Sequence, residues 1–195
     1  MPGRSRRRGE ELLAALHGAA LAELDEVGLG RLTMEGIARR AGTPKTTLYR
    51  RWSTPEDVLL DAIAAAYPVE RPSPAADDLR GDLIAALELL LEWSRDPTAR
   101  AVQAIMLERH RYPGLVDRLE GVFDRAGRRF TATVLRHYAR LGLVDPTLVT
   151  HVVEDLGEAL VFKHVVDSGA EPTPEQLAAI VDEAILPAVG MRPPR

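Results

Sequence analysis

The chain has 195 residues, of which 46% are hydrophobic, with a formal net charge of −4 and no cysteine. This length and composition suffice for a hydrophobic core in one or two domains, and the lack of cysteine excludes a disulfide framework, a thiolate metal site and a cysteine nucleophile. The best membrane-span candidate, LIAALELLLEW, is interrupted by Glu88 and Glu92 and falls short of roughly 18 apolar residues. We therefore expect a cytoplasmic protein with no membrane partner and no secretory leader.

An arginine-rich segment opens the chain and a helix follows it. Residues 1–9 contain four arginines, and we expect them to form a disordered basic arm that either aids solubility or contacts nucleic acid. After this arm, apolar residues recur at helical spacing until Gly28 ends the pattern. They are Leu13, Leu16, Ala20, Leu24 and Val27.

Two short helices separated by a tight turn are predicted over residues 33–52. Thr33 is a good N-cap for the first, and Gly42 ends it because glycine enters the left-handed conformation of a C-terminal cap without steric cost. Thr43 as N-cap and Pro44 as first helical residue would begin the second helix at once. A helix end followed so closely by a new helix start predicts a helix-turn-helix.

The second helix of this pair combines two apolar anchors with a basic, polar surface. Leu48 and Trp52 lie four residues apart and can face inward together. Residues in the first turn of such a helix meet base edges in the major groove, where lysine donates to guanine and threonine contacts bases. Residues in the last turn are better placed for phosphate. The first turn holds Lys45, Thr46 and Thr47, and the last turn holds Tyr49, Arg50 and Arg51.

Basic side chains are concentrated near the N-terminus. Residues 1–52 carry ten Lys and Arg against six Asp and Glu, whereas the remainder carries fifteen against twenty-three. A capped helix pair occurs in many all-α proteins, and its basic face can simply be solvated. The local positive charge in an acidic chain favours nucleic acid as the partner. The alternative, an N-terminal part that binds protein, predicts weak dependence of binding on salt, in contrast to DNA binding.

These residues are similar to a known family. The pattern is Thr33-x-x-x-Ile37-Ala38-x-x-Ala41-Gly42, then Lys45-x-Thr47-Leu48-Tyr49-x-x-Trp52, then Thr54-Pro55-Glu56-Asp57-x-Leu59. It resembles the DNA-binding domain of TetR-family transcriptional regulators over about residues 10–67. The resemblance implies a dimeric repressor that binds a palindromic operator in double-stranded DNA and is released by a small-molecule effector. It also implies DNA contacts by Thr33, Thr43, Lys45, Thr46, Thr47, Tyr49, Arg50 and Arg51.

The chain departs from the family pattern at two dipeptides. Thr43-Pro44 stands where the family often has Val-Ser, and Arg51-Trp52 stands where it has His-Phe. Trp52 still supplies an aromatic anchor. Gly36, which costs ~1 kcal/mol relative to alanine inside a helix, indicates close packing against a neighbouring helix.

The remainder of the chain is helical in period and punctuated by glycine and proline. A connecting helix over 54–67 leads from a DNA-binding domain (1–53) into an effector-binding and dimerisation domain (54–195). We expect an all-α fold of about nine helices, with an N-terminal three-helix domain and a C-terminal helical bundle. After the connecting helix, the predicted helices span about 76–95, 97–111, 113–141, 146–167 and 174–189.

The last two predicted helices each carry a wide apolar stripe. Part of each stripe must cover its own domain. A helix-turn-helix protein that binds two half-sites about 34–36 Å apart nevertheless needs two copies, and two helices from each copy can form a four-helix bundle. With Gly157 allowing close approach, we predict a homodimer through Val152, Leu156, Ala159, Leu160, Ile180, Val181, Ala184 and Ile185.

Aromatic and methionine residues of the middle helices are candidates to line an effector pocket. Pockets between bundle helices are mostly apolar with a few polar groups. The same residue types at helical spacing are more often ordinary core. The candidates are Trp93, Met106, His110 and Phe123.

An enzymatic function finds little support. The motifs GxGxxG, GxxxxGK[ST], HExxH and GxSxG do not occur. His151, Glu154, Asp155 and Glu158 share one helical face, but carboxylate-bridged metal sites use repeated Glu-x-x-His pairs on several helices, and a second set is missing. A charged exposed stripe, or ion pairs across a dimer, explains this group better. We predict a protein without enzymatic activity, cofactor or metal.

Overall fold

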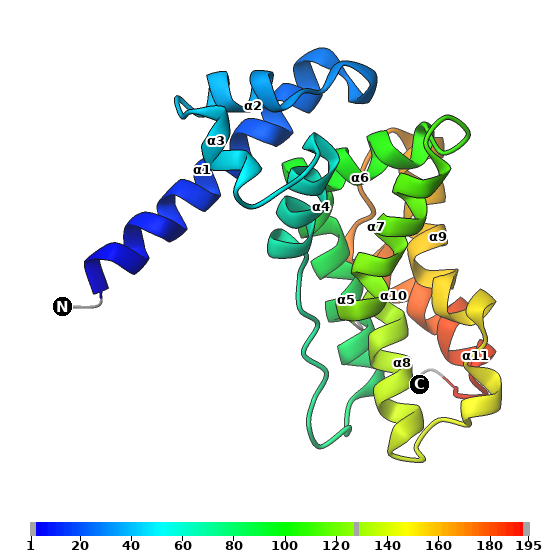
Figure 1. The fold of residues 1–195 in the computed structure, drawn as a ribbon. Coiled ribbons are helices and arrows are strands. Elements are labelled where there is room, and N and C mark those ends of the chain that lie inside the picture. The colour runs from blue at the N-terminus through cyan, green and yellow to red at the C-terminus, as the bar shows by residue number, and fades with distance from the viewer. Residues whose placement is uncertain (1–2, 127–128, 193–195) are drawn as a thin grey trace. The chain divides into compact units, whose positions relative to one another are not determined.

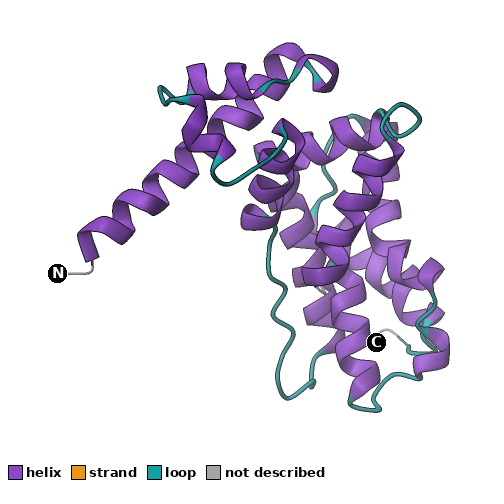
Figure 2. Cartoon of the chain, in the orientation of Figure 1, coloured by secondary structure: helices purple, strands orange, loops and turns teal. Residues whose placement is uncertain are grey.

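The computed structural model describes residues 3–126 and 129–192, with side chains described over 9–123 and 129–192. Within these ranges the chain forms helices, turns and loops and no strand (Figure 2). The all-α prediction is confirmed. The described helices include none that is long and apolar enough to cross a bilayer. The helices form two compact units, Met1–Tyr67 with Arg95–Ala126, and Pro68–Ser94 with Gly127–Arg195, which we call the first and the second unit.

The first unit is built around two helices, α1 and α4. Its elements are α1 (Gly3–Val27), the 3-10 turn η1 (Leu29–Arg31), α2 (Met34–Arg40), α3 (Lys45–Tyr49), α4 (Pro55–Ala66), α6 (Pro97–Leu107) and α7 (Pro113–Ala126) (Figure 1). α1 packs against α2, α4 and α6, and α4 also packs against α6 and α7. Leu59 and Ile63 of α4 are fully buried in this core. α4, α6 and α7 thus belong to the same compact unit as the helix pair, although the functional boundary is predicted at residue 54.

Most helix starts of the first unit follow the capping residues seen in the sequence. Thr33 caps α2, where its hydroxyl accepts a hydrogen bond from Gly36 N at 3.0 Å. Thr54 and Asp57 form a capping box at α4. Asp96 caps α6. These three starts lie where the sequence pattern predicts them.

Two helix starts differ from expectation. α1 begins at Gly3, inside the segment 1–9 that we expected to be disordered, and arginine is a good helix former; the arginine side chains of that segment lie outside the described side chains. α3 begins at Lys45, and its N-cap is Pro44 and not Thr43, because Pro44 has an extended ψ of 142°. The hydroxyl of Thr43 instead donates to the hydroxyl of Thr47 at 3.2 Å.

Gly36 lets a buried carboxylate of α1 rest on α2. Glu23 is only 3% exposed and accepts a hydrogen bond from Arg40 Nε at 3.1 Å. A Cβ atom at position 36 would lie 2.0 Å from Glu23 Oε1. The close packing predicted from this glycine is confirmed.

The second unit is a bundle whose long helices are α5, α8 and α9. Its elements are α5 (Leu79–Ser94), α8 (Phe130–Arg140), the 3-10 turn η2 (Pro146–Leu148), α9 (His151–Ser168), α10 (Pro174–Ile180), the π-turn η3 (Val181–Ile185) and α11 (Leu186–Ala188). α8 packs against α5 and α9, and α10 and η3 pack against the same two helices, α5 and α9. The run from α10 to α11 corresponds to the helix predicted over 174–189. Its π-turn precedes Pro187, which lacks an N–H to continue the regular ladder.

The helix predicted over 113–141 is two helices in the structure. α7 ends at Ala126 and α8 begins at Phe130. Phe130 has a φ of 39°, a conformation that residues other than glycine rarely adopt. Its ring is 1% exposed and lies 5.8 Å from the ring of Trp93, so burial of the ring offsets the backbone cost. Apolar spacing continues on both sides of the break and therefore does not reveal it.

Two ion pairs cross between helices of the second unit. Arg136 of α8 donates from Nε and Nη2 to the two carboxylate oxygens of Glu154 on α9, at 2.5 and 2.7 Å. Arg80 of α5 makes the same two-pronged contact with Asp182 of η3, at 2.7 and 2.9 Å. Glu154 is buried, so this pair depends on its geometry to offset the loss of solvation.

Glu158 of α9 faces inward and lacks such a guanidinium clamp. Burial, together with the negative charges of Asp155 and Glu70, raises the pKa of Glu158 to about 7, although Arg129 opposes the shift. The folded protein therefore holds a proton on Glu158 at pH values where the unfolded chain has released it.

Gly36→Ala should lower the free energy of unfolding by about 1–3 kcal/mol, since an added carbon in a packed site strains its surroundings. Gly18→Ala is the matched control, because Gly18 lies in α1 with no atom within 4 Å of an added Cβ. That variant should be neutral or more stable by up to ~1 kcal/mol. Urea unfolding of the two proteins measures the difference. Equal stabilisation by both substitutions would contradict the packing of Glu23 on Gly36.

Glu158→Gln should change how stability depends on pH. The pKa of Glu158 is about 7 in the folded state against an ordinary value of 4.5, so the folded state binds more protons between these values. Glu158 therefore makes stability fall as pH rises through this window, by on the order of 1–3 kcal/mol. The glutamine variant should lack this contribution in urea unfolding at about pH 5 and pH 8. If the free energy of unfolding depended on pH in the same way in both proteins, the raised pKa of Glu158 would be contradicted.

Candidate functional site

The orientation of α3 is set by two buried side chains. Leu48 is fully buried and Trp52, just past the end of the helix, is 8% exposed. The Trp52 ring lies 6.0 Å from the ring of His17 on α1, and His17 Nε2 lies 3.0 Å from Asp61 Oδ2 on α4. Both predicted anchors are therefore buried, and Trp52 lies against α1 while α3 packs on α2. The remaining faces of α3 point away from this core.

Most residues predicted to contact DNA lie on this outward side, whereas Arg51, just past the end of α3, lines a groove next to Trp52. Tyr49 is 55% exposed, an unusual position for a large aromatic ring without a partner. Thr43 and Thr47 are half-buried, and their hydroxyls bond each other. The exposed members of the predicted set are Thr33, Lys45, Thr46, Tyr49, Arg50 and Arg51. The structure thus brings the predicted set onto neighbouring turns of α2 and α3.

A carboxylate that sequence reasoning missed lies on the same surface. Glu35, in the first turn of α2, forms an ion pair with Lys45, in the first turn of α3. Hydrogen bonding to Lys45 holds the pKa of Glu35 below its ordinary value, and hydrogen bonding to Glu35 raises the pKa of Lys45. Both groups are charged at neutral pH. Their separation by ten residues and a turn leaves no local sequence signal for the pair.

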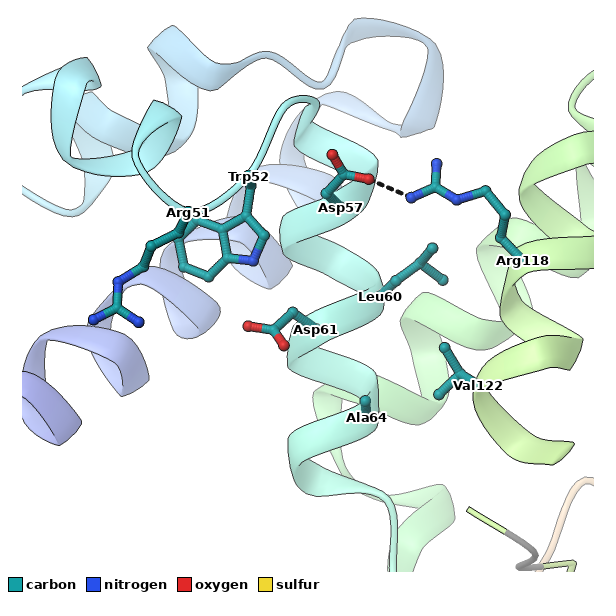
Figure 3. A pocket seen from close by; sticks show the side chains of 8 residues that line it. All are labelled: Arg51, Trp52, Asp57, Leu60, Asp61, Ala64, Arg118 and Val122. Carbon is teal, nitrogen blue, oxygen red and sulfur yellow. Dashed lines mark hydrogen bonds and ion pairs between the residues drawn. The ribbon is translucent and has the colours of Figure 1, made fainter. Parts of the chain in front are cut away.

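A groove of about 450 Å³ lies beside the end of α3, between α4 and α7 (Figure 3). Trp52 and Leu60 form part of its apolar wall, and Arg118 of α7 reaches across to Asp57 of α4. Asp57 also accepts from the backbone N–H groups of Ser53 and Thr54, at 3.0 and 2.8 Å. Although burial opposes it, these bonds keep the pKa of Asp57 below its ordinary value. One carboxylate therefore joins the start of α4 to α7.

The four candidate effector residues do not converge on one cavity. Phe123 lies against Tyr67, with ring centroids 4.8 Å apart, in the first unit. Met106 and His110 are exposed at the end of α6 and in the turn after it. Trp93 is half-buried beside Phe130 in the second unit. Phe123 and Trp93 therefore pack as core aromatics do.

The predicted dimer residues divide into three groups by exposure. Val152 is 76% exposed, whereas Val181 and Ile185 are fully buried and cover α5 and α9 within their own chain. Val181 and Ile185 are therefore removed from the candidate interface, since the inner and outer stripes of that helical run have the same apolar spacing. Ala159 is exposed, and four members are half-buried: Leu156, Leu160, Ile180 and Ala184.

Gly157 also faces inward, and two exposed apolar residues were missed. A Cβ atom at Gly157 would lie 2.9 Å from Thr131 Cγ2, so this glycine serves packing inside the second unit. Phe162 and Val166 are 59% and 63% exposed on the outer side of α9. Together with Val152 and Ala159 they extend an apolar face along the helix, which we call the α9 outer face.

The acidic group on α9 does not form a metal site. Glu154 is engaged by Arg136, and the side chain of His151 is 99% exposed at 3.6 Å from Glu154. Asp155 points to solvent while Glu158 is partly buried. Among the described residues there is no group of three or more His, Asp or Glu side chains able to hold a metal ion.

Comparisons with known proteins agree with this geometry. Residues 17–63 match the family model described as bacterial regulatory proteins, tetR family, and residues 73–184 match the tetracyclin repressor-like C-terminal domain. An uncharacterized HTH-type transcriptional regulator of Mycobacterium bovis is 28% identical over 183 residues, 93% of this chain and 88% of that protein. The DNA-binding transcriptional repressor TetR of Mycobacteroides abscessus is 40% identical over 86 residues, 43% of this chain and 44% of that protein.

A solved structure shares both the fold and part of the sequence. The TetR family transcription regulator SCO0332 superposes with a TM-score of 0.63 and 25% identity, covering 90% of this chain and 97% of that one. The two family models together span both the helix pair and most of the second unit, with the exposed face of α3 inside the first match. The chain belongs to the TetR family of DNA-binding, helix-turn-helix transcriptional regulators.

Proposed function

We propose that this regulator is a repressor that binds a palindromic operator as a homodimer and leaves it when a small-molecule effector binds. The observation that carries the proposal is the surface of α3, where Leu48 and Trp52 are buried and basic and hydroxyl side chains are exposed. The Mycobacteroides abscessus relative is named a repressor, which supports the direction of regulation.

The two ends of α3 have different tasks in this proposal. Lys45 and Thr46 are exposed in the first turn, where side chains of a recognition helix contact base edges. Tyr49, Arg50 and Arg51 are exposed at the other end and contact phosphate, together with Thr33 at the start of α2. The exposed hydroxyl of Tyr49 donates to a phosphate oxygen. Base contacts then give specificity, and phosphate contacts give register and affinity.

Lys45→Ala and Tyr49→Phe should both weaken binding to an operator selected from a random duplex library. We expect losses of about 5- to 100-fold for the lysine, which contacts a base, and about 2- to 10-fold for the tyrosine, which loses one hydrogen bond. Fluorescence anisotropy with the selected duplex measures both. Arg109→Ala is the control for loss of a positive charge, because Arg109 is exposed in the same unit outside the helix pair.

The sequence of the selected duplexes tests the proposal more broadly. A palindrome with half-sites about one DNA turn apart is expected for a two-fold symmetric dimer. Selection of no common sequence, or wild-type affinity in both α3 variants, would show that this surface is not the one that reads DNA.

The proposed dimer forms through the α9 outer face and the groove next to it. α9 is apolar on opposite sides, with Gly157 and Val161 turned inward and Phe162 and Val166 turned outward. An apolar face that one chain leaves exposed is commonly an interaction surface. The groove, of about 540 Å³, runs between α9 and the α10–η3 run and carries both charge signs, with Lys163 and Glu183 on its walls. A second copy of this chain matches such a self-complementary surface.

Phe162→Glu should convert the dimer to a monomer, because a charge would be buried without a partner at the centre of the α9 outer face. Leu107→Glu is the matched control: Leu107 is 82% exposed at the end of α6, in the first unit. Light scattering at micromolar concentration should give a dimer for the wild type and for the control. A monomeric wild type would refute the proposed interface.

Release by an effector requires a ligand that binds two conformations with different affinities. The proposal places the response in α4, because α4 follows the helix pair directly and Asp57 ties its first turn to α7. Operator occupancy that is the same with and without a ligand known to bind the protein would contradict release by that ligand.

A further inference from the structure

An ion pair between Glu35 and Lys45 lies on the exposed surface of the helix pair. The two side chains are 56% and 50% exposed and belong to the first turns of α2 and α3. Lys45 is a proposed base-reading residue. Its charge is already paired with Glu35 before DNA binds. Arg50 and Arg51, by contrast, have no acidic partner within the described part of the chain.

This pair changes what Lys45 can gain from different DNA sites. A lysine ammonium carries three donors, so it can keep one bond to Glu35 while donating to guanine O6 or N7. A contact to phosphate is less favourable, because drawing Lys45 to the backbone leaves the Glu35 carboxylate near the phosphate charge, where like charges repel. The carboxylate thus favours a base contact over a phosphate contact.

We propose that Glu35 is a specificity-determining residue: it positions Lys45 for a guanine in the operator and withholds its charge from the DNA backbone. This inference rests on the proposed reading role of α3. Glu35 itself need not touch DNA, since it acts through Lys45. It lowers affinity for DNA of random sequence more than it lowers affinity for the operator.

The test compares Glu35→Gln with the wild type on two duplexes of equal length, the selected operator and a random sequence. Glutamine keeps the shape and removes the charge, which frees Lys45 for phosphate. The affinity for random DNA at low salt should rise about 3- to 10-fold, and the slope of log K against log salt should steepen by about 0.9 for one added phosphate contact. Operator affinity should stay constant or rise less, so the ratio of the two affinities falls.

Asp25→Asn is the matched control for a change of one charge. Asp25 is 46% exposed on α1 and pairs with Arg100 at 3.1 Å in the same unit. This variant should leave the affinity ratio and the salt slope as in the wild type. In a Lys45→Met background, Glu35→Gln should have little further effect, because Glu35 acts through Lys45. Thermal unfolding of every variant separates these readouts from a loss of folded protein.

The experiment distinguishes a failure of the proposed Glu35 role from a failure of operator binding itself. If the wild type prefers its operator but Glu35→Gln shows the same ratio and slope as Asp25→Asn, the role of Glu35 is refuted while operator binding stands. An effect of Glu35→Gln that persists in full without Lys45 also refutes it. A wild type that fails to distinguish the selected duplex from random DNA refutes the proposed function instead.

Discussion

The burial of Trp52 is the constraint on which the exposed surface of α3 depends. A single indole fills the junction of three elements, because its ring meets His17 of α1 while His17 bonds Asp61 of α4. Large aromatic side chains contribute the most buried area per residue to such a junction. With Trp52 and Leu48 fixed inward, the rotation of α3 about its axis is determined. Lys45, Thr46 and Tyr49 of that short helix are then exposed to solvent.

An ion pair between α1 and α2 also stabilises this arrangement. Glu23 is buried against α2 and joined to Arg40, which is possible only because position 36 lacks a side chain. A buried carboxylate without such a partner would destabilise the fold. The helix pair is therefore held by an apolar contact at α3 and by an ionic one at α2. The carboxylate of the helix pair itself, Glu35, pairs with Lys45, while Arg50 and Arg51 are exposed to solvent.

Much of this fold was predictable from local rules, and the failures have physical causes. Capping residues and prolines predicted the starts of α2, α4 and α6, and the four-residue spacing of Leu48 and Trp52 predicted the inward face of α3. The break before Phe130 was missed, because a backbone strain offset by burial leaves no periodic signal. Val181 and Ile185 were misplaced because a stripe that covers its own domain has the same spacing as one that covers a partner. Apolar spacing identifies the apolar side of a helix but does not show whether the same chain or a partner packs on that side.

In the candidate site, sequence spacing likewise failed to predict an ion pair. The exposure of Lys45 and Tyr49 followed from the helix pattern, whereas the partner of Lys45 did not. Glu35 is ten residues away and comes close only through the angle between α2 and α3. Pairings that depend on an interhelical angle are invisible to any rule based on spacing within one helix.

The carboxylate of Asp57 joins two segments that lie behind α3. It bonds two successive backbone amides at the entry to α4 and a guanidinium from α7 at the same time. The same carboxylate thus contacts the backbone before α4 and a side chain of α7. That entry lies two residues beyond Trp52. One side chain therefore links α7 to the segment that connects Trp52 with α4.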